Sequence, residues 1–257
     1  MFRSAAKQTP RYRPALEALE DRYAPATVGP VLNGTVLTIT AKNSGSNIVI
    51  SDNGAGFGNN ITVNFDNNKP AVFASVTTIN IVGSNNRDKV TYNLTSAFGA
   101  SNRVVNVNLA EGNDVVNFNA SNINISTGAS LSFNVQQGGG SITVAALYSG
   151  VINGALNFNA TADLKPSNVC AQFQVQSGST GNLNANLTGG TGKDYLTLAV
   201  CQANTGDPVV ISATINAVGK GNQKDILAIT PGVLVNSLSG EKFTPKILTS
   251  CSVCAES

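Results

Sequence analysis

The chain has 257 residues, of which 42% are hydrophobic and only 12% charged, and its formal net charge is +2. It contains no His and no Trp, which excludes His-dependent catalytic triads, His general bases and His-ligated zinc sites. There is no basic patch with interleaved aromatics, so nucleic acid is not an expected partner. No apolar run reaches the roughly 18 residues of a membrane-spanning helix, so no membrane span is expected.

Residues 1–30 differ from the rest in composition, because four prolines punctuate a segment that is rich in charge. The segment has no apolar core of the kind found in ordinary secretory signal peptides. We therefore expect a flexible N-terminal targeting segment that serves export or surface sorting. The alternative is a short amphipathic helix that arose by chance on a flexible tail.

The LEALEDR stretch of this segment resembles the N-terminal motif of planctomycete extracellular proteins, which reads roughly R-x-LE-x-LE-R before an A-P segment. The matching residues are Arg13, Leu16, Glu17, Leu19, Glu20 and Arg22, followed by Ala24, Pro25 and Ala26. The resemblance covers about 15 residues and implies a secreted or cell-surface protein, often with β-rich repeats after the motif. It implies no enzymatic activity.

A repeat of about 27 residues follows this segment. Its units are expected to start at Asn33, Asn60, Asp88, Asp114, Ser141, Asn168, Asp194 and Asp225. Each unit contains two short runs of alternating apolar and polar residues, separated by turns rich in Gly and Asn. A fixed period of this size indicates similar units that stack and bury their apolar faces on one another.

The alternation has the period of a β-strand, which puts one set of side chains inward and the other outward. The predicted inward residues are Val63, Phe65, Ile79, Ile81, Val90, Tyr92, Val105, Val107, Leu109, Val116, Phe118, Leu131, Phe133, Leu156, Phe158, Leu196, Leu198, Ile211 and Ile215. No long stretch of the repeat region has helical periodicity. The sequence thus predicts an all-β fold.

Two all-β architectures fit the repeat. The first is a right-handed parallel β-solenoid, or β-helix, over residues 31–240, with about seven to eight coils and a C-terminal tail at 241–257. The second is an antiparallel β-sandwich or meander in which each repeat is a hairpin. We favour the solenoid, because most linkers exceed a two-residue hairpin turn and leave room for a third short strand.

The chain has 33 Asn residues, and many occupy the polar strand positions. In a stack, equivalent side chains recur about every 4.8 Å, so Asn side chains can form amide ladders from coil to coil. The alternative is that Asn is simply a polar surface residue here.

The segment GGTGKDYLT at residues 189–197 fits the calcium nonapeptide G-G-x-G-x-D-x-U-x. It resembles the repeat of RTX-type toxins and secreted proteases, although those motifs occur in tandem and this copy stands alone. The resemblance implies a Ca²⁺ site with Asp194 and the carbonyls of Gly190 and Gly192, completed by Asn168 or Asp225 from a neighbouring coil. With so few carboxylates we expect at best weak binding; the alternative is that these Asp residues only form turns.

Four cysteines are present, and even numbers in an exported protein suggest disulfides. We expect Cys170 and Cys201 on the polar face, with an offset of about 16 Å along the strands that is too long for a direct bond. Cys251 and Cys254 form a CSVC motif, a weak indication of metal or redox chemistry. Either disulfides pin the tail to the stack or the tail carries an unstructured pair of thiols.

These observations predict a non-catalytic exported β-repeat protein with a structural or adhesive role at the cell surface or in the extracellular matrix. Its partners would be cell-envelope polysaccharides or other surface proteins. The alternative is a carbohydrate-active β-helix, a lyase or hydrolase, which needs charged side chains clustered in a groove. The acidic residues of the repeats do not recur at matching strand positions, so we expect no enzyme and no cofactor other than weakly bound Ca²⁺.

Overall fold

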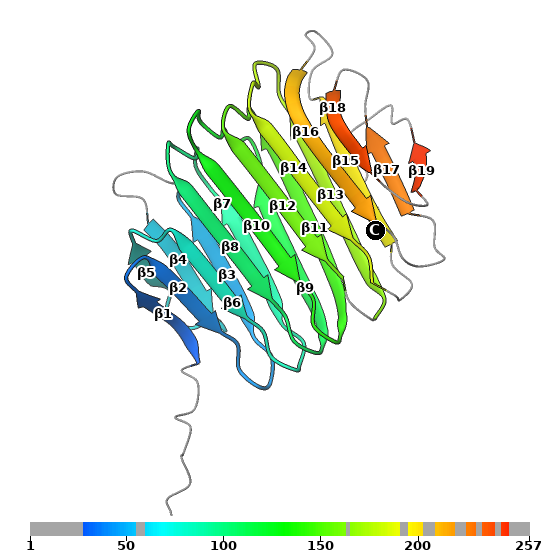
Figure 1. Ribbon diagram of the computed structural model, residues 1–257. Helices are drawn as coiled ribbons and strands as arrows, with labels where there is room; N and C mark the ends of the chain where they lie inside the picture. Colours follow the sequence, from blue (N-terminus) through cyan, green and yellow to red (C-terminus); the bar gives the residue numbers. More distant parts are fainter. Residues whose placement is uncertain are drawn as a thin grey trace, which may run out of the picture.

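The computed structural model describes residues 28–54, 60–162, 165–190 and 195–202, and the backbone of four further strands near the C-terminus. Every element in the described part of the chain is a β-strand (Figure 1). The first ten strands are β1 (Gly29–Asn33), β2 (Val36–Thr40), β3 (Asn47–Asp52), β4 (Asn60–Phe65), β5 (Ala71–Ala74), β6 (Thr78–Val82), β7 (Lys89–Leu94), β8 (Asn102–Asn108), β9 (Asn113–Ala120) and β10 (Ser130–Gln136). They are followed by β11 (Ser141–Gly150), β12 (Ala155–Thr161), β13 (Ser167–Val175), β14 (Asn182–Thr188), β15 (Tyr195–Gln202), β16 (Val209–Val218), β17 (Asp225–Ile229), β18 (Val233–Ser239) and β19 (Phe243–Lys246).

The strands form two sheets that face each other across the core. Sheet A has the order β1-β2-β6-β8-β10-β12-β14-β16-β18, and sheet B the order β19-β17-β15-β13-β11-β9-β7-β3-β4-β5. From β6 onward the chain alternates between the sheets, and each strand pairs in parallel with the next strand of its own sheet. β2 and β3 begin these two parallel series, because β2 pairs with β6 and β3 with β7. This is a β-solenoid with coils of about 27 residues, as the sequence predicted.

A third side of the coil is much shorter than the two sheets. Isolated parallel bridges join Phe98 to Ile125 and Ile125 to Ile152, in the connections that lead from sheet B to sheet A. All three side chains are fully buried. The predicted third strand is thus present over three successive coils, reduced to single bridges.

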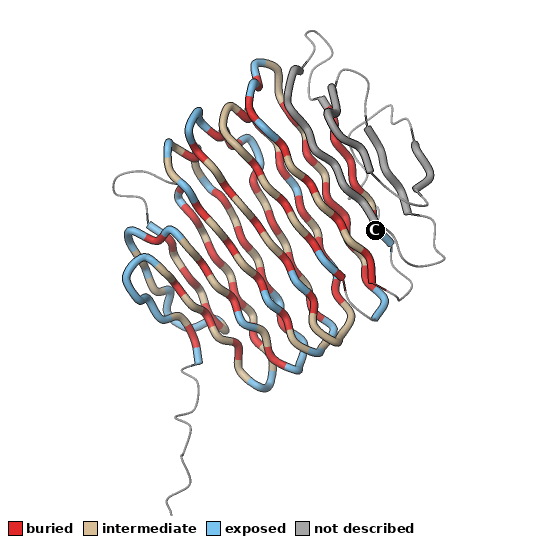
Figure 2. Tube along the Cα trace, viewed as in Figure 1, coloured by how far each residue is buried: buried red, intermediate tan, exposed pale blue. Residues whose placement is uncertain are grey.

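The core lies between the sheets, and strands alternate buried and half-buried residues in bands along the stack (Figure 2). Every predicted inward residue that the structure describes is buried, whereas the side chains of Ile211 and Ile215 lie outside the described residues. Phe118 contacts Phe133 with ring centroids 4.9 Å apart, and Phe133 stacks on Phe158 at 6.1 Å. Successive coils therefore share one aromatic core.

The N-terminal end departs from the repeat. β1 pairs antiparallel with β2, and β4 and β5 extend sheet B as an antiparallel meander on β3. The prediction that Asn33 and Asn60 start parallel coils is therefore wrong. Gly34 has φ 59° in the two-residue turn between β1 and β2, a geometry that closes a hairpin rather than a coil. Asp66 and Asn67, with φ of 52° and 58°, turn the chain after β4.

Two further details differ from the prediction: which sheet contains each run of the first coil, and which residues lie in register with Asp114. The unit starts at Asn33 and Asp88 predict that their first runs, TVLTIT and KVTYNL, share a sheet. Instead TVLTIT forms β2 in sheet A beside β6, and KVTYNL forms β7 in sheet B beside β3, so this part of the prediction is wrong. Ile142 lies opposite Asp114 and also opposite Ser167, so Ile142 and Ser167, and not the predicted Ser141 and Asn168, continue the column of Asp114.

Candidate functional site

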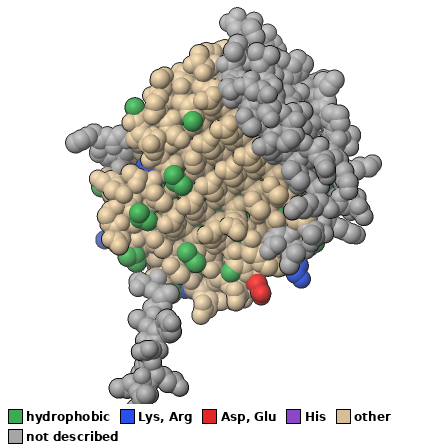
Figure 3. Space-filling model, viewed as in Figure 1, with side chains coloured by type: hydrophobic (Ala, Val, Ile, Leu, Met, Phe, Trp, Pro, Cys, Tyr) green, Lys and Arg blue, Asp and Glu red, His purple; other side chains and the backbone are tan. Residues whose placement is uncertain are grey.

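The outer face of sheet A is an extended surface without charged side chains on its described strands. Its outward positions on β2, β6, β8, β10, β12 and β14 are occupied by Asn, Thr, Ser, Gln, Val and Ala, and none is charged. Figure 3 shows this face as mainly polar surface, with scattered hydrophobic side chains and with charged atoms only near its border. We call it the sheet A face.

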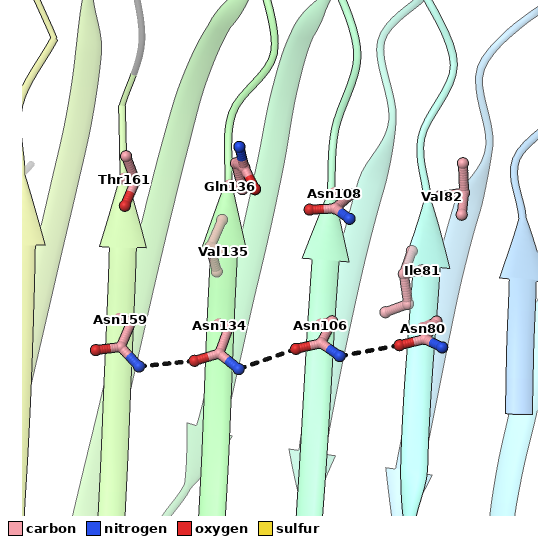
Figure 4. A pocket seen from close by; sticks show the side chains of 10 residues that line it. All are labelled: Asn80, Ile81, Val82, Asn106, Asn108, Asn134, Val135, Gln136, Asn159 and Thr161. Atoms are coloured by element: carbon pink, nitrogen blue, oxygen red, sulfur yellow. Dashed lines mark hydrogen bonds between the residues drawn. The ribbon is translucent and has the colours of Figure 1, made fainter. Parts of the chain in front are cut away.

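A ladder of Asn side chains runs across the sheet A face. The Asn106 amide donates to Asn80 Oδ1 at 2.9 Å, Asn134 donates to Asn106 at 2.9 Å, and Asn159 donates to Asn134 at 2.7 Å (Figure 4). Asn186 donates in turn to Asn159. The predicted amide ladder is confirmed, and it links five consecutive strands of the sheet.

A second row runs parallel to this ladder, two residues further along each strand. It consists of Val82, Asn108, Gln136 and Thr161, all exposed. Between the ladder and this outer row lies a shallow hollow, which Figure 4 shows from close by. The hollow is lined only by uncharged side chains.

The chemistry of these rows is that of a neutral hydrogen-bonding surface. A side-chain amide has two N–H donors and two acceptor lone pairs, and a ladder bond on each side uses one of each. The inner ladder residues Asn106, Asn134 and Asn159 each donate and accept one such bond, so each keeps one donor and one acceptor for a ligand or water. The sheet A face suits an uncharged polar partner that presents hydroxyl or amide groups at regular spacing.

The described residues also contain one charged cluster inside the core. Arg103 Nε lies 2.9 Å from Asp52 Oδ2, and the Tyr92 hydroxyl donates to the same oxygen at 2.6 Å. Asp52 and Tyr92 are 0% exposed and Arg103 is 3% exposed. Burial raises the pKa of the Asp52 carboxyl, opposed by the positive charge of Arg103. No substrate can reach a cluster so enclosed.

Sequence reasoning missed this cluster although the pattern contained a signal for it. Asp52 continues the inward series of Ile48 and Ile50, and Arg103 precedes Val105 by two residues. Both charged residues thus stand at inward positions of the alternation, Asp52 inside a predicted run and Arg103 directly before one. The alternation that identified the apolar core therefore also puts these two opposite charges inside, where they can form an ion pair.

The Asp residues at the corner before sheet B join neighbouring coils. Asp88 accepts the backbone N–H of Ser46 at 2.7 Å and that of Ser84 at 2.6 Å. The backbone N–H of Asp88 donates in turn to Asp114 Oδ1 at 2.8 Å. Asp114 Oδ2 is buried without a hydrogen-bond partner in the structure. Burial is the main cause that raises the pKa of Asp114 to about 6.

The residues predicted to bind Ca²⁺ are only partly described. Gly192 and Asp194 lie outside the described residues, as does the side chain of Asp225 in β17. Gly190 is buried just after β14, and Asn168 is half-buried in β13, opposite Tyr195. In the described ranges, no group of three or more acidic or Cys side chains could hold a metal ion. The calcium site stays a prediction.

Cys170 and Cys201 were expected on the polar face, and both are instead buried, at 4% and 0% exposure. They do occupy the outward positions of β13 and β15, because the core contains their neighbours Val169, Ala171 and Val200 and not the cysteines. Both are disulfide-bonded. Cys251 and Cys254 lie outside the described residues.

In the part of the chain that the structure describes, no helix is long and apolar enough to cross a membrane. No protein-family model, no curated protein and no solved structure matches the chain.

Proposed function

We propose that this chain is a non-catalytic exported protein with a structural or adhesive role at the cell surface or in the extracellular matrix, and that its sheet A face is the contact surface. The observation that carries the proposal is the uncharged face of laddered amides. A neutral cell-envelope polysaccharide is the partner that suits it best, since hydroxyl groups pair with both halves of an amide. Other surface proteins are the competing partners.

Two further observations support this proposal. Cys170 and Cys201 are disulfide-bonded, and disulfides persist in oxidising environments outside the cytosol. The N-terminal LEALEDR motif resembles that of planctomycete extracellular proteins. Both agree with an extracellular or cell-surface location.

A carbohydrate-active β-helix is the competing function. Such an enzyme needs charged side chains that converge in a groove open to substrate. In the described ranges the charged cluster of Asp52 and Arg103 is sealed inside the core, and the hollow on the sheet A face has an uncharged lining. These features favour binding over catalysis.

The test combines location with binding. Fractionation of cells that produce a tagged chain should place it in the envelope or medium, and recovery in the cytosol would contradict export. The purified chain should co-sediment with insoluble neutral polysaccharide. The variant Asn108→Glu/Gln136→Glu, which puts two charges on exposed positions of the outer row, should lose most of this binding.

Thr143→Glu is the matched control, because Thr143 is exposed on the outer face of sheet B. It should bind polysaccharide as the wild type does. Equal retention of all three proteins would remove the sheet A face from the proposal. Release of soluble sugar fragments during the incubation would favour the enzyme instead.

A further inference from the structure

The two disulfide-bonded cysteines lie on the outer side of sheet B, where a β-solenoid normally meets solvent. Cys170 in β13 and Cys201 in β15 are nevertheless buried, and so is Ala199, which also points outward. Tyr195, at the start of β15, is 54% exposed on the same side. The covering of this face is therefore local to the two cysteines and the residue between them.

The register shows that these cysteines are not bonded to each other. Cys170 lies opposite Thr197, and Cys201 lies opposite Gln174, so the two are four residues apart along neighbouring strands. That offset is about 13 Å along the strand, to which the spacing between strands is added. A disulfide requires Cα atoms only about 4.4–6.8 Å apart.

The chain has four cysteines, so the bonding partners of Cys170 and Cys201 within the chain are Cys251 and Cys254. We propose that the CSVC segment is fastened across the outer face of sheet B by two disulfides, one to Cys170 and one to Cys201. The reach allows it. Three residues extend over about 10 Å, and a disulfide at each end adds about 5.5 Å between Cα atoms.

Formation of the two bonds is an oxidation that needs an electron acceptor. A cysteine thiolate attacks a disulfide-containing oxidant and forms a mixed disulfide, which the second thiolate of the pair resolves. For each new S–S bond, the two electrons and the two thiol protons leave together on the oxidant, whose own disulfide is reduced to a dithiol. The reaction therefore belongs to an oxidising compartment.

The consequence is an asymmetry between the two outer faces. The fastened segment covers sheet B at β13 and β15, while the sheet A face stays open along its described strands. It also joins the C-terminal end of the chain to coils that lie well before it in the sequence. This inference does not depend on the proposed function.

Peptide mapping of the full chain tests the proposal. The chain is produced in an oxidising compartment, alkylated in denaturant without reductant, and digested. The expected product joins the peptides that contain Cys170 and Cys201 to the C-terminal peptide from Ile247 onward. A bond within CSVC, a bond between Cys170 and Cys201, or a disulfide-linked dimer would overturn the proposal, as would alkylation of all four thiols.

Single variants then assign the pairing. Cys251→Ser should leave either Cys170 or Cys201 open to alkylation in denaturant, and Cys254→Ser should leave the other. The same free thiol in both variants would contradict two separate bonds. The wild-type map does not depend on these variants, so a variant that fails to fold leaves the test intact.

Discussion

The N-terminal end and the stacked coils pair their polar side chains differently. At the N-terminal end, single charged pairs occur once each: Asp52 with Arg103 inside the core, and Lys42 with Asp66 at 2.8 Å near the surface. In the stack, an uncharged amide recurs at the same position of successive coils. An ion pair of two different residues occurs at a single position, whereas an amide that bonds to another amide can recur in every coil.

Hydrogen-bond chemistry explains this difference. An Asn side chain carries both donors and acceptors, so a column of Asn satisfies itself. A carboxylate only accepts, so a column of Asp needs donors of another kind. Asp88 finds them in backbone N–H groups of two turns, while Asp114 finds one for Oδ1 and none for Oδ2. Asp88 and Asp114, which we call the corner column, thus recur from coil to coil as the amides do, but only Asp88 has hydrogen-bond donors for both carboxylate oxygens.

The largest effect is expected at the N-terminal charged cluster. Arg103→Leu would leave the buried Asp52 carboxylate without its ion pair, and such a change costs about 3–5 kcal/mol in the free energy of unfolding. Urea unfolding of the purified protein measures it.

The double variant Asp52→Leu/Arg103→Leu is the control for that change. It removes both charges, so it should recover most of the loss, because an apolar pair of similar size often matches a buried ion pair. If the double variant is no more stable than Arg103→Leu, the loss comes from altered packing and not from an unpaired charge.

In the stack, close packing of the corner glycines gives the next largest effect. A Cβ on Gly140 would lie 1.9 Å from the carbonyl oxygen of Gly112 in the coil before, so the backbone would have to move. We expect Gly140→Ala to cost about 3 kcal/mol, the upper end for overpacking. Thermal and urea unfolding would show it.

Gly139→Ala, one residue earlier, is the matched control. A Cβ there would meet the flexible Glu111 side chain at 3.3 Å, and we expect a change within about 0.5 kcal/mol. Equal losses in both variants would point to glycine flexibility at this turn and away from contact between coils.

The sequence predicted the stack better than its N-terminal end for a physical reason. Parallel coils repeat one environment, so alternation placed residues such as Phe133 and Phe158 correctly in the core. The hairpin at Gly34 and the meander of β4 and β5 occur only once, so a prediction based on the 27-residue period treats them as two further coils. The Asn33-Gly34 pair is a strong hairpin signal, but the 27-residue period predicts a coil start at the same place.

The candidate surface was only partly predictable. The columns of Asn predicted the ladder, because outward positions in register must stack. The lack of charge on the whole sheet A face depends on which runs share a sheet, and that assignment was wrong for the first coil. The burial of Cys170 and Cys201 had no sequence signal, since alternation describes one layer and not what covers it.

The corner column adds a pH dependence. The pKa of Asp114 is raised to about 6 from the ordinary 3.8, so the folded state holds this proton more tightly than the unfolded state does. The contribution of this proton to the free energy of unfolding is present at about pH 4 and is lost as the pH rises through about 6. A shift of about two units is worth about 2–3 kcal/mol.

Asp114→Asn should therefore be as stable as the wild type or more stable at pH 8, and this advantage should vanish at pH 4. The amide oxygen can still accept the Asp88 N–H. Urea unfolding at both pH values measures the difference between the two proteins, which isolates this carboxyl from the others. A constant difference across the range would contradict a raised pKa.

Asp88→Asn should destabilise the protein, in contrast to Asp114→Asn. Both oxygens of Asp88 accept backbone N–H groups, so an amide would turn its NH₂ toward a donor. The loss should be about 2 kcal/mol, the cost of one unsatisfied buried group. Chemical denaturation at pH 7 measures it, and a loss no larger than that of Asp114→Asn would mean that the two corners are equivalent.

The smallest effect should come from the repeated amides themselves. Asn106→Ala removes the bond that Asn106 donates to Asn80 and the one it accepts from Asn134. Both neighbours are half-buried and can bind water instead, so we expect a loss of about 1 kcal/mol. Asn108→Ala, on the same strand but in the exposed outer row, should change stability by less than about 0.5 kcal/mol. Urea unfolding of the two variants compares ladder and outer row directly. Equal losses would mean that Asn acts here through strand propensity alone, whereas a loss confined to Asn106 would show that the ladder stabilises the stack while the outer row remains available to a partner.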